Sequence, residues 1–480
     1  MKAWDTRPRQ RFWDAALCLA PLILAASAIF FVRAFLGFQF PVPWPDETGF
    51  VSPAFELAYT GSLFDPGMNP DRTVMWMPPG YMVVLAAAFR LFGYSFALAR
   101  WVSAACCLAA LGLASALALR YTAGWQRVAA CWVVGLAFLS PYMLIDANIA
   151  RMEMPLAALL LLALMAAWGG RLYVALALVI GASVIHFNAV YFLPPVLLAF
   201  AAALWRGRWR WPGTGGWIAL IAACAAWLLY AAHIALNWRG FQDDIGFQFA
   251  LKRFVSQNDP AHPLWPVLAG AALAAATSWW RRLDGASLAA LFGLSFLVMA
   301  RNGHEIWYDY GQSLGFALIA VALLAAENTA GCNRRRIAMR NAASVLAITL
   351  VCIMGLRMTD TMRALRPHRA MLSRGVVAPE QIAQVRGFIR TLPRGVTINF
   401  GWTGMENFFL TDMANAGAHW IIVRHSVTQT WPLRAADWRI VCDSSEWPPM
   451  LFAFDIDHPR HGVDSGCVII PLAQDNAPRR

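Results

Sequence analysis

Long apolar runs with almost no charge constrain this chain more than any other feature of its sequence. The window 217–236 carries no acidic or basic residue apart from one histidine. A helix needs about 20 mostly apolar residues to cross a hydrocarbon core about 30 Å thick, because it must satisfy its own backbone there. The chain is 59% hydrophobic and only 14% charged, whereas soluble domains carry about a quarter charged residues. The sequence therefore predicts an α-helical polytopic membrane protein.

About eleven segments are predicted to cross the membrane. The first follows a basic N-terminal stretch and is too long for an ordinary signal peptide, so it is predicted to remain as an uncleaved span. The predicted spans are 12–36, 97–119, 127–146, 152–169, 172–186, 189–205, 216–236, 263–280, 286–300, 311–327 and 341–356.

Basic residues orient these spans, because cytoplasmic loops carry an excess of Lys and Arg. The ambiguous segment is 78–93, which is apolar but short, begins with two prolines and carries Arg90. If it does not cross, nearly every basic cluster lies on the cytoplasmic side, whereas a crossing would turn the later clusters outward. We therefore predict an interfacial helix at 78–93, a cytoplasmic N-terminus and an extracytoplasmic tail in a bacterial inner membrane. The net charge of +12 is then a topology signal and indicates no nucleic-acid partner.

The basic clusters that this topology places inside come from short loops between spans. They are Lys2 with Arg7, Arg9 and Arg11, Arg120 with Arg127, Arg171, Arg206 with Arg208 and Arg210, Arg281 with Arg282, and 334–336 with Arg340.

The chain changes character after residue 356. Residues 1–356 are predicted to form the membrane domain, and 357–480 a small extracytoplasmic α/β domain. Helical patterns lie at 379–391 and 404–416. Two cysteines of the tail, Cys442 and Cys467, can pair if the tail lies outside the cytoplasm, and the sequence leaves that open. The strand-like runs are VTINF, HWIIV, RIVCD, MLFAFDI and CVIIPL.

The first predicted outer loop holds the most informative polar residues. Asp46 and Glu47 follow Pro45 just beyond the first span. Carboxylates at a membrane surface suit a general base, alone or with a metal ligand. The alternative is a helix start, since acidic residues favour the first turn. Spacing alone does not separate the two interpretations.

An ordered set of short sequences in this loop resembles a known superfamily. The set runs from the Asp46–Glu47 pair through YTGSL to PPGY, RLFG and the ALAR segment that ends at Arg100. Over residues 40–110 it resembles the first-loop signature of GT-C glycosyltransferases, above all bacterial relatives of dolichyl-phosphate-mannose–protein mannosyltransferases (family 39) and lipid A aminoarabinose transferases. Through the rest of the membrane region the resemblance is weak, and it does not cover the tail.

The resemblance implies a GT-C-like fold and a reaction on the outer face of the membrane. Members transfer a sugar from a polyprenyl-phosphate carrier to an acceptor, which here can be a lipid, a glycan or a protein. Carried over, the acceptor base is Asp46, with Glu47 as its neighbour. A carboxylate also suits an oxocarbenium-like transition state. Some relatives place a Lys before the double proline, where this chain has Met77, and Arg72 is a candidate replacement.

A lipid-phosphate leaving group requires cations. Arginines on the predicted outer face run against the positive-inside bias and are therefore candidates, although snorkelling at the interface is the alternative for each. They are Arg72, Arg100, Arg151, Arg239, Arg253 and Arg301, with Lys252.

Two further polar segments lie at predicted outer span ends. The sequence ANIARMEMP places Glu153 beside Arg151, and ionisable groups there are candidates for substrate contact; an interfacial ion pair is the alternative. His186 lies on a short turn, where it could bind a phosphate or serve a structural role.

The last outer cluster is ARNGHEIWYDYGQSLGF at 300–316. His304, Tyr308 and Tyr310 are predicted to contact the donor, as aromatic motifs do at this place in relatives. A divalent cation held by Asp46 and Glu305 stays open, since no zinc spacing is present. The loop 237–262 is predicted to lie on the membrane as a lid.

Three functions are compatible with the sequence. The first is an inverting glycosyltransferase that uses a polyprenyl-phosphate sugar. The second is a transporter or flippase for a lipid-linked glycan, which predicts polar residues at mid-membrane and inverted repeats. Polarity concentrates on one predicted face instead, which favours the enzyme. The third is an inactive relative that acts as a scaffold.

Overall fold

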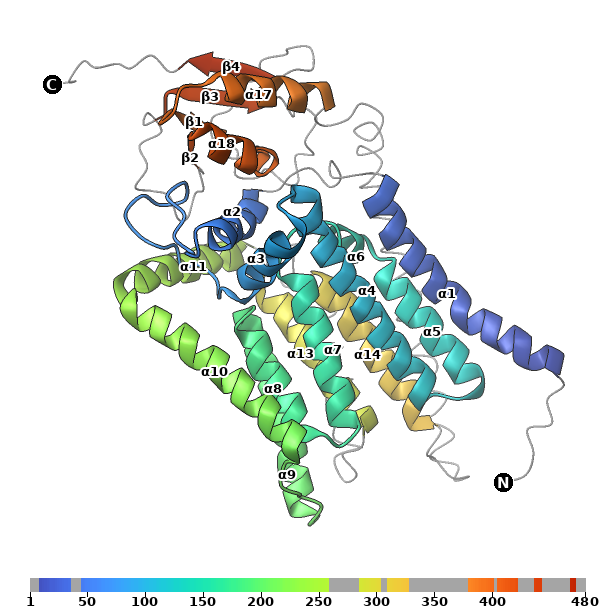
Figure 1. The fold of residues 1–480 in the computed structure, drawn as a ribbon. Helices are drawn as coiled ribbons and strands as arrows, with labels where there is room; N and C mark the ends of the chain where they lie inside the picture. Colours follow the sequence, from blue (N-terminus) through green and yellow to red (C-terminus); the bar gives the residue numbers. More distant parts are fainter. Residues whose placement is uncertain are drawn as a thin grey trace.

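The computed structural model describes residues 8–35, 45–258, 285–303, 309–327, 379–400, 404–421, 436–442 and 467–471. Helices of the membrane region form a bundle, and the C-terminal α/β unit lies on one end of it, over α2 and α3 (Figure 1). The helices of the first half are α1 (Pro8–Phe35), α2 (Pro45–Tyr59), α3 (Gly80–Phe92), α4 (Phe96–Tyr121), α5 (Gly124–Phe138), α6 (Pro141–Asp146), α7 (Glu153–Trp168) and α8 (Leu172–Ser183). They are followed by η2 (Phe187–Phe192), α9 (Leu193–Trp205), α10 (Thr214–Leu236), α11 (Trp238–Asn258), α13 (Gly285–Gly303) and α14 (Asp309–Glu327).

Four helices of the described ranges are long and apolar enough to cross a membrane: Asp14–Arg33, Phe96–Tyr121, Phe187–Trp205 and Thr214–Leu236. Shorter apolar helices accompany them at Gly80–Phe92, Glu153–Trp168, Leu172–Ser183, Gly285–Ala300 and Tyr310–Ala325. Every predicted span within the described ranges is helical, although 127–146 is divided between α5 and α6. The predicted spans 263–280 and 341–356 lie outside those ranges.

Local sequence sets where several helices begin and where they meet. The Ser95 hydroxyl caps α4 by accepting a hydrogen bond from the Leu98 N–H at 3.0 Å. Helices α13 and α14 approach closely at Gly293 and Gly315, where a Cβ on either residue would lie within 2.8 Å of the other's carbonyl oxygen. Small residues let membrane helices pack in this way.

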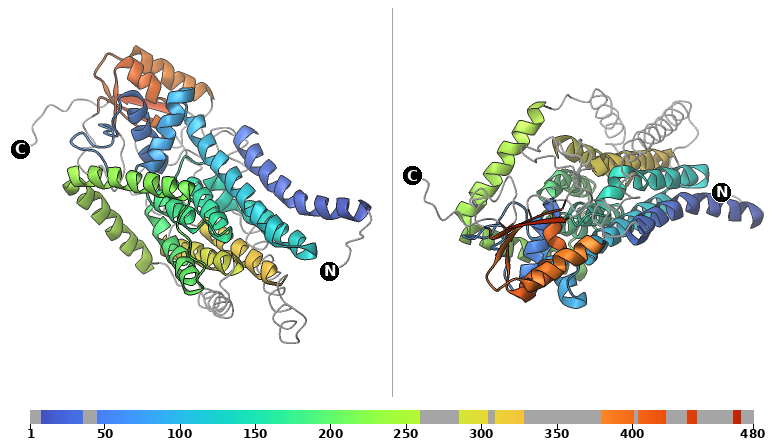
Figure 2. Two further views of the ribbon diagram at one scale, coloured as in Figure 1. Left: turned by 60° about the horizontal axis from the view of Figure 1, so that its bottom comes forward. Right: turned by 90° about the horizontal axis from the view of Figure 1, so that it is seen from above.

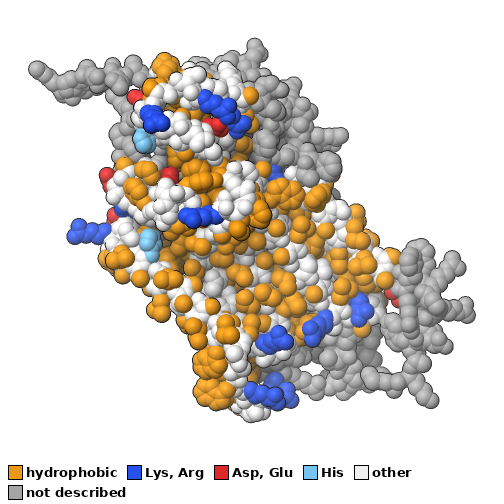
Figure 3. Space-filling model, viewed as in Figure 1, with side chains coloured by type: hydrophobic (Ala, Val, Ile, Leu, Met, Phe, Trp, Pro, Cys, Tyr) orange, Lys and Arg blue, Asp and Glu red, His pale blue; other side chains and the backbone are white. Residues whose placement is uncertain are grey.

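Charge is distributed unevenly over the bundle. Figure 3 shows a broad hydrophobic surface with Lys and Arg side chains along the rim opposite the C-terminal unit. At that end α4 finishes with Arg120, Arg171 lies between α7 and α8, and the segment between α9 and α10 contains Arg208 and Arg210. These arginines belong to the basic clusters that the sequence assigns to the cytoplasmic side.

The segment predicted to lie in the interface forms α3. At 13 residues this helix is about 20 Å long, shorter than the hydrocarbon core. It packs on α2 (Figure 2), and its buried residues Tyr81, Leu85 and Phe89 belong to the same hydrophobic cluster as residues of the C-terminal unit.

The C-terminal unit contains the four-stranded sheet β2-β1-β3-β4. Strands β1 and β2, and likewise β1 and β3, pair in parallel, whereas β3 and β4 are antiparallel. Four of the five predicted strands are thereby confirmed, and the fifth, 450–456, lies outside the described ranges. The described elements of the C-terminal unit are α17 (Pro379–Thr391), β1 (Thr397–Asn399), η4 (Met405–Phe408), α18 (Leu410–Ala416), β2 (His419–Ile421), β3 (Trp438–Cys442) and β4 (Cys467–Pro471).

The sequence predicts one helical segment at 404–416, and the structure divides it into two helical elements. The chain forms a short 3-10 turn, η4, and then α18, which ends at Gly417 in the left-handed conformation, with φ of 65°. In the backbone register of β3 and β4, Cys442 lies opposite Cys467.

The C-terminal unit is joined to the membrane region by a shared hydrophobic core. Phe50, Phe55 and Met68 of the first loop cluster with Trp420 and Phe409 of the C-terminal unit. The predicted boundary at residue 357 lies outside the described residues. The first loop and the C-terminal unit therefore form one layer on the end of the bundle.

Candidate functional site

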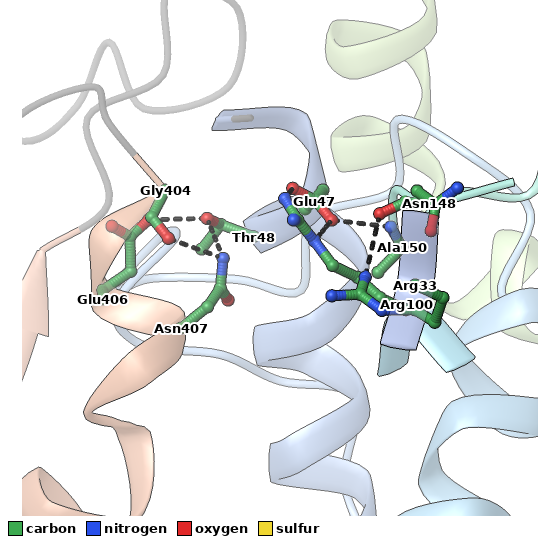
Figure 4. Close-up of polar contacts among 9 residues, drawn as sticks. All are labelled: Arg33, Glu47, Thr48, Arg100, Asn148, Ala150, Gly404, Glu406 and Asn407. Atoms are coloured by element: carbon green, nitrogen blue, oxygen red, sulfur yellow. Dashed lines mark hydrogen bonds and ion pairs between the residues drawn. The ribbon is translucent and has the colours of Figure 1, made fainter. Parts of the chain in front are cut away.

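The first turn of α2 places the acidic pair at the boundary between bundle and C-terminal unit. Pro45 begins the helix, and Asp46 and Glu47 occupy its first turn, where a carboxylate is favoured by the helix dipole. Thr48 points toward the C-terminal unit, and Glu47 points toward Arg100 of α4 (Figure 4). One helix turn thus connects the two parts of the molecule.

Glu47 is completely buried and held from two sides. Its Oε1 accepts hydrogen bonds from Arg100 Nε at 2.8 Å and from the Ala150 N–H at 2.6 Å. Its Oε2 accepts from Arg100 Nη2 at 2.5 Å, and both side chains are 0% exposed. A bidentate pair of this kind fixes orientation as well as charge. Glu47 therefore anchors α2 to α4 and to the segment before α7.

Asp46 lies at the accessible side of the same turn. Its carboxylate pairs with Arg151 Nη1, and its side chain is 20% exposed, whereas Arg151 is 2% exposed. Arg151 also donates from Nη2 to Glu153 Oε1 at 2.8 Å, and Glu153 is buried at the start of α7. Arg151 is consequently shared between two carboxylates, of which only Asp46 reaches solvent.

A third buried arginine completes this arrangement. Arg33, near the end of α1, is 2% exposed, and its Nη1 lies 3.4 Å from the Asn148 carbonyl oxygen (Figure 4). The sequence-based candidates did not include it. Its place at the predicted outer end of the first span was the available signal, because an arginine there runs against the positive-inside bias. The site thus gathers three arginines (Arg33, Arg100 and Arg151) and three carboxylates (Asp46, Glu47 and Glu153).

The backbone of Arg151 is tied to the interfacial helix. Ser103 of α4 donates to the Arg151 carbonyl oxygen at 3.3 Å, and the Tyr81 hydroxyl of α3 lies 2.9 Å from the Ser103 hydroxyl. Burial raises the pKa of Tyr81 well above its usual value. Tyr81 is therefore a neutral hydrogen-bonding group that holds α3, α4 and the Arg151 segment together.

Two residues of η4 hold the same turn of α2 from the side of the C-terminal unit. Thr48 Oγ1 donates to Glu406 Oε1 at 2.6 Å, and Asn407 Nδ2 donates to Thr48 Oγ1 at 2.9 Å. One turn further along α2, Ser52 Oγ accepts a hydrogen bond from Trp420 Nε1 at 3.2 Å. Glu406 and Asn407 are buried. Nothing in the sequence pattern linked these residues, which are more than 350 positions apart.

Burial shifts the titration of the carboxyl groups in this layer. It raises the pKa of Glu406 to about 7, with a further upward contribution from Asp65. It also raises the pKa of Asp65 to about 6 and that of Glu56 to about 7. Burial in each case disfavours the charged carboxylate and so favours the neutral form.

The other predicted residues contact other parts of the chain or lie beyond the described ranges. Arg72 donates from Nη1 and Nη2 to the two oxygens of Asp244 on α11, at 2.7 Å each. Asp244 also accepts from the Met75 N–H at 2.7 Å, so the first loop is pinned to the amphipathic helix that was predicted as a lid.

His186 and Tyr310 are both buried. His186 Nδ1 accepts from the Asn188 N–H at 2.9 Å within its own turn, and the Tyr310 hydroxyl lies 3.8 Å from Met299 Sδ in the packing of α13 against α14. His304, Glu305 and Tyr308 fall outside the described residues. Over the described ranges, no group of three His, Cys, Asp or Glu side chains is arranged to hold a metal ion.

Comparison with solved structures identifies the fold. ArnT from Cupriavidus metallidurans bound to undecaprenyl phosphate matches with a TM-score of 0.52 and 13% identity, covering 96% of this chain and 99% of that chain. ArnT in the apo state gives 0.48 at 14% identity, with 91% and 94% covered. The archaeal oligosaccharyltransferase AglB from Archaeoglobus fulgidus, in complex with an inhibitory peptide and a dolichol-phosphate, gives 0.47 at 12% identity, with 91% and 70% covered. No protein-family model and no curated protein matches the chain.

The match to undecaprenyl-phosphate-bound ArnT extends over nearly the whole of both chains. The predicted GT-C-like membrane fold is therefore confirmed. At this identity the likeness concerns the fold, and the roles of individual residues remain predictions.

Proposed function

We propose that this chain is an inverting glycosyltransferase that moves a sugar from a polyprenyl-phosphate carrier to an acceptor on the outer face of the inner membrane. The observation that carries the proposal is the acidic first turn of α2. In a GT-C-like fold, Asp46 is the member of the Asp46, Glu47 and Glu153 set that reaches solvent. The ArnT structure was solved with undecaprenyl phosphate, which supports a carrier of that class.

Asp46 and Glu47 take different roles in this proposal. Glu47 is fully buried and fixed by Arg100, so it positions the turn and does not reach an acceptor. Asp46 receives the proton from the acceptor hydroxyl. The pairing with Arg151 keeps its carboxylate oriented, and Glu153 keeps Arg151 in place when Asp46 is engaged.

The proposed step balances as a single displacement. The acceptor oxygen forms a bond to the anomeric carbon from the face opposite the phosphate, and its proton passes to Asp46. The bond between the anomeric carbon and the phosphate oxygen breaks, and the electron pair leaves with the lipid phosphate. The sugar therefore changes its anomeric configuration.

The donor phosphate requires positive charge near the site. Arg151 and Arg72 are the proposed contacts, because Arg72 is 28% exposed and Arg151 adjoins Asp46. Arg100 acts indirectly in this proposal, because it holds Glu47 and so fixes the first turn of α2. His186, His304, Tyr308 and Tyr310 stay as predicted contacts for donor or sugar.

The C-terminal unit holds the catalytic turn in place. Glu406 and Asn407 grip Thr48, two positions after Asp46. The unit thereby limits the positions that Asp46 can take, and precise placement of a base matters greatly for rate.

The test is transfer by purified full-length protein with a panel of synthetic polyprenyl-phosphate sugars. The expected result is a glycosylated acceptor with inverted anomeric configuration, read by NMR, together with released polyprenyl phosphate. The same protein in liposomes separates enzyme from transporter. Movement of intact donor across the bilayer without any product would refute the transferase and favour the flippase.

A further inference from the structure

A cavity of about 430 Å³ lies at the end of the bundle opposite the C-terminal unit. It is formed by the segment between α7 and α8 and by the segment between α9 and α10. The polar and aromatic side chains that line it include Arg171, Tyr173, Arg208, Trp209, Arg210 and Trp211. Trp209 and Trp211 contact each other with ring centroids 4.7 Å apart. Two chain segments thus bring three guanidinium groups and two indoles to one hollow.

Among the described residues, no acidic side chain lines this positively charged cavity. Across the described part of the chain, Arg171, Arg208 and Arg210 form no ion pair. The N-terminal turn of α10, with Gly213, Gly215 and Gly216, also borders the cavity, and a helix N-terminus adds partial positive charge.

The cavity opens beside a surface suited to hydrocarbon. Helices α9 and α10 expose Leu204, Trp205, Ile218 and Ile221, and Ile218 and Ile221 lie within the apolar helix Thr214–Leu236. A ligand in the cavity can therefore place acyl chains along this surface while its polar end meets the arginines.

We propose that this cavity binds the phosphate-bearing headgroup of an anionic membrane lipid. Basic pockets between membrane helices recognise such headgroups, and tryptophans sit at the level of the headgroups. The volume lies within the range of ligand sites, 300–1,000 Å³, and exceeds what a bare phosphate ion fills. The site is separate from the acidic turn of α2 and does not depend on the proposed reaction.

The test uses native mass spectrometry of the full-length protein in detergent. Phosphatidylglycerol and phosphatidylcholine with the same acyl chains are titrated in parallel, and inorganic phosphate is added as a competitor. We expect phosphatidylglycerol to bind preferentially and R208Q/R210Q to weaken its binding about tenfold or more. The matched control is R120Q/R127Q, which removes the same charge at the same end of the bundle outside the cavity and should change binding less than twofold.

A second readout does not require the arginine variant to fold. Brominated phosphatidylglycerol should quench the tryptophan fluorescence of the wild-type protein more than that of W209F/W211F. The proposal is overturned by equal binding of the two lipids, by equal losses in the two arginine variants, or by identical quenching of the wild type and W209F/W211F. Displacement of the lipid by inorganic phosphate at equal affinity also overturns it, because the site would then recognise a free anion.

Discussion

The two ends of the bundle use arginine in opposite ways. At the end that carries the C-terminal unit, the guanidinium groups of Arg100 and Arg151 are buried and paired with carboxylates. At the other end, Arg171, Arg208 and Arg210 line an open cavity that has no Asp or Glu among its described lining residues. The Arg100–Glu47 pair holds helices together, and the arginines of the cavity leave their charge for a partner outside the chain.

This contrast distinguishes arginines that stabilise the fold from arginines that are available to bind a ligand. A buried arginine with a bidentate carboxylate is already satisfied, so its removal should disturb the fold before it disturbs a ligand. Arg171, Arg208 and Arg210 form no ion pair within the described ranges, so their removal should weaken ligand binding before it disturbs the fold. The distinction also applies within the acidic turn, where Glu47 is satisfied and Asp46 remains accessible.

The largest effect is expected from breaking the buried pair. Arg100→Met or Glu47→Leu alone leaves one charge buried without its partner, which should lower the free energy of unfolding by about 3–5 kcal/mol. The double variant R100M/E47L removes both charges and should lose less than either single variant. Thermal unfolding in detergent checks this. Single variants as stable as the wild type would contradict the assignment of Glu47 as an anchor.

The docking of the C-terminal unit should depend on pH through Glu406. Its pKa is raised from 4.5 to about 7 by burial, so the folded state holds the proton that the unfolded state loses between these values. Stability should therefore fall as pH rises from 4.5 to about 7, by about 3 kcal/mol at most, and then level off. Glu406→Gln should remove this part of the pH dependence, as measured by protease protection of the unit. Identical pH profiles for the two proteins would refute the role of Glu406.

A smaller loss is expected when the hydroxyl of Thr48 is removed. Thr48→Val keeps the shape but deprives Glu406 and Asn407 of their shared partner, which should cost about 1–2 kcal/mol. The transfer rate should fall while the affinity for donor changes little, because the base is displaced and the donor contacts remain. Thr391→Val is the control, since Thr391 is exposed on α17. Equal effects in the two variants would remove the positioning role of the C-terminal unit.

The smallest effect concerns two ion pairs whose arginines are exposed. Asp412 accepts from Arg386 Nε at 2.7 Å and from Arg390 Nη2 at 3.2 Å, but these arginine side chains are 40% and 67% exposed. Such pairs contribute about 0–1 kcal/mol. Asp412→Asn should therefore shift the melting temperature by only a few degrees. A loss as large as that of Arg100→Met would show that burial does not separate the two kinds of pair.

Local sequence patterns predicted the helices and strands well, because each of these elements is determined by a short stretch of neighbouring residues. The apolar run of α10 and the proline-bounded helix α17 are examples, and the observed α17, Pro379–Thr391, matches the predicted range. Asp46, Arg151 and Glu153 were predicted as separate candidates from their positions at span ends. Their assembly around one guanidinium is a tertiary fact, which spacing along the chain does not contain.

The residues that sequence reasoning missed owe their places to long-range packing. Glu406 meets Thr48 across 358 positions, and a glutamate in a short polar tail carries no sign of burial. Arg33 lies inside the first predicted span, 12–36, and it was not singled out from the sequence. The pairings of Arg72 with Asp244 and of Glu47 with Arg100 were likewise invisible, since the helices that carry them are brought together only by the fold.

The most direct test is the transfer rate per folded molecule of Asp46→Asn, measured beside Asp412→Asn as a matched carboxylate-to-amide control in the C-terminal unit. Arg151 retains Glu153 as a partner, so Asp46→Asn should keep the melting temperature of the wild type. Its transfer rate should fall about 10²–10⁴-fold, the usual contribution of a general base, while Asp412→Asn stays near wild type. Full activity in a folded Asp46→Asn protein would contradict the account at its centre.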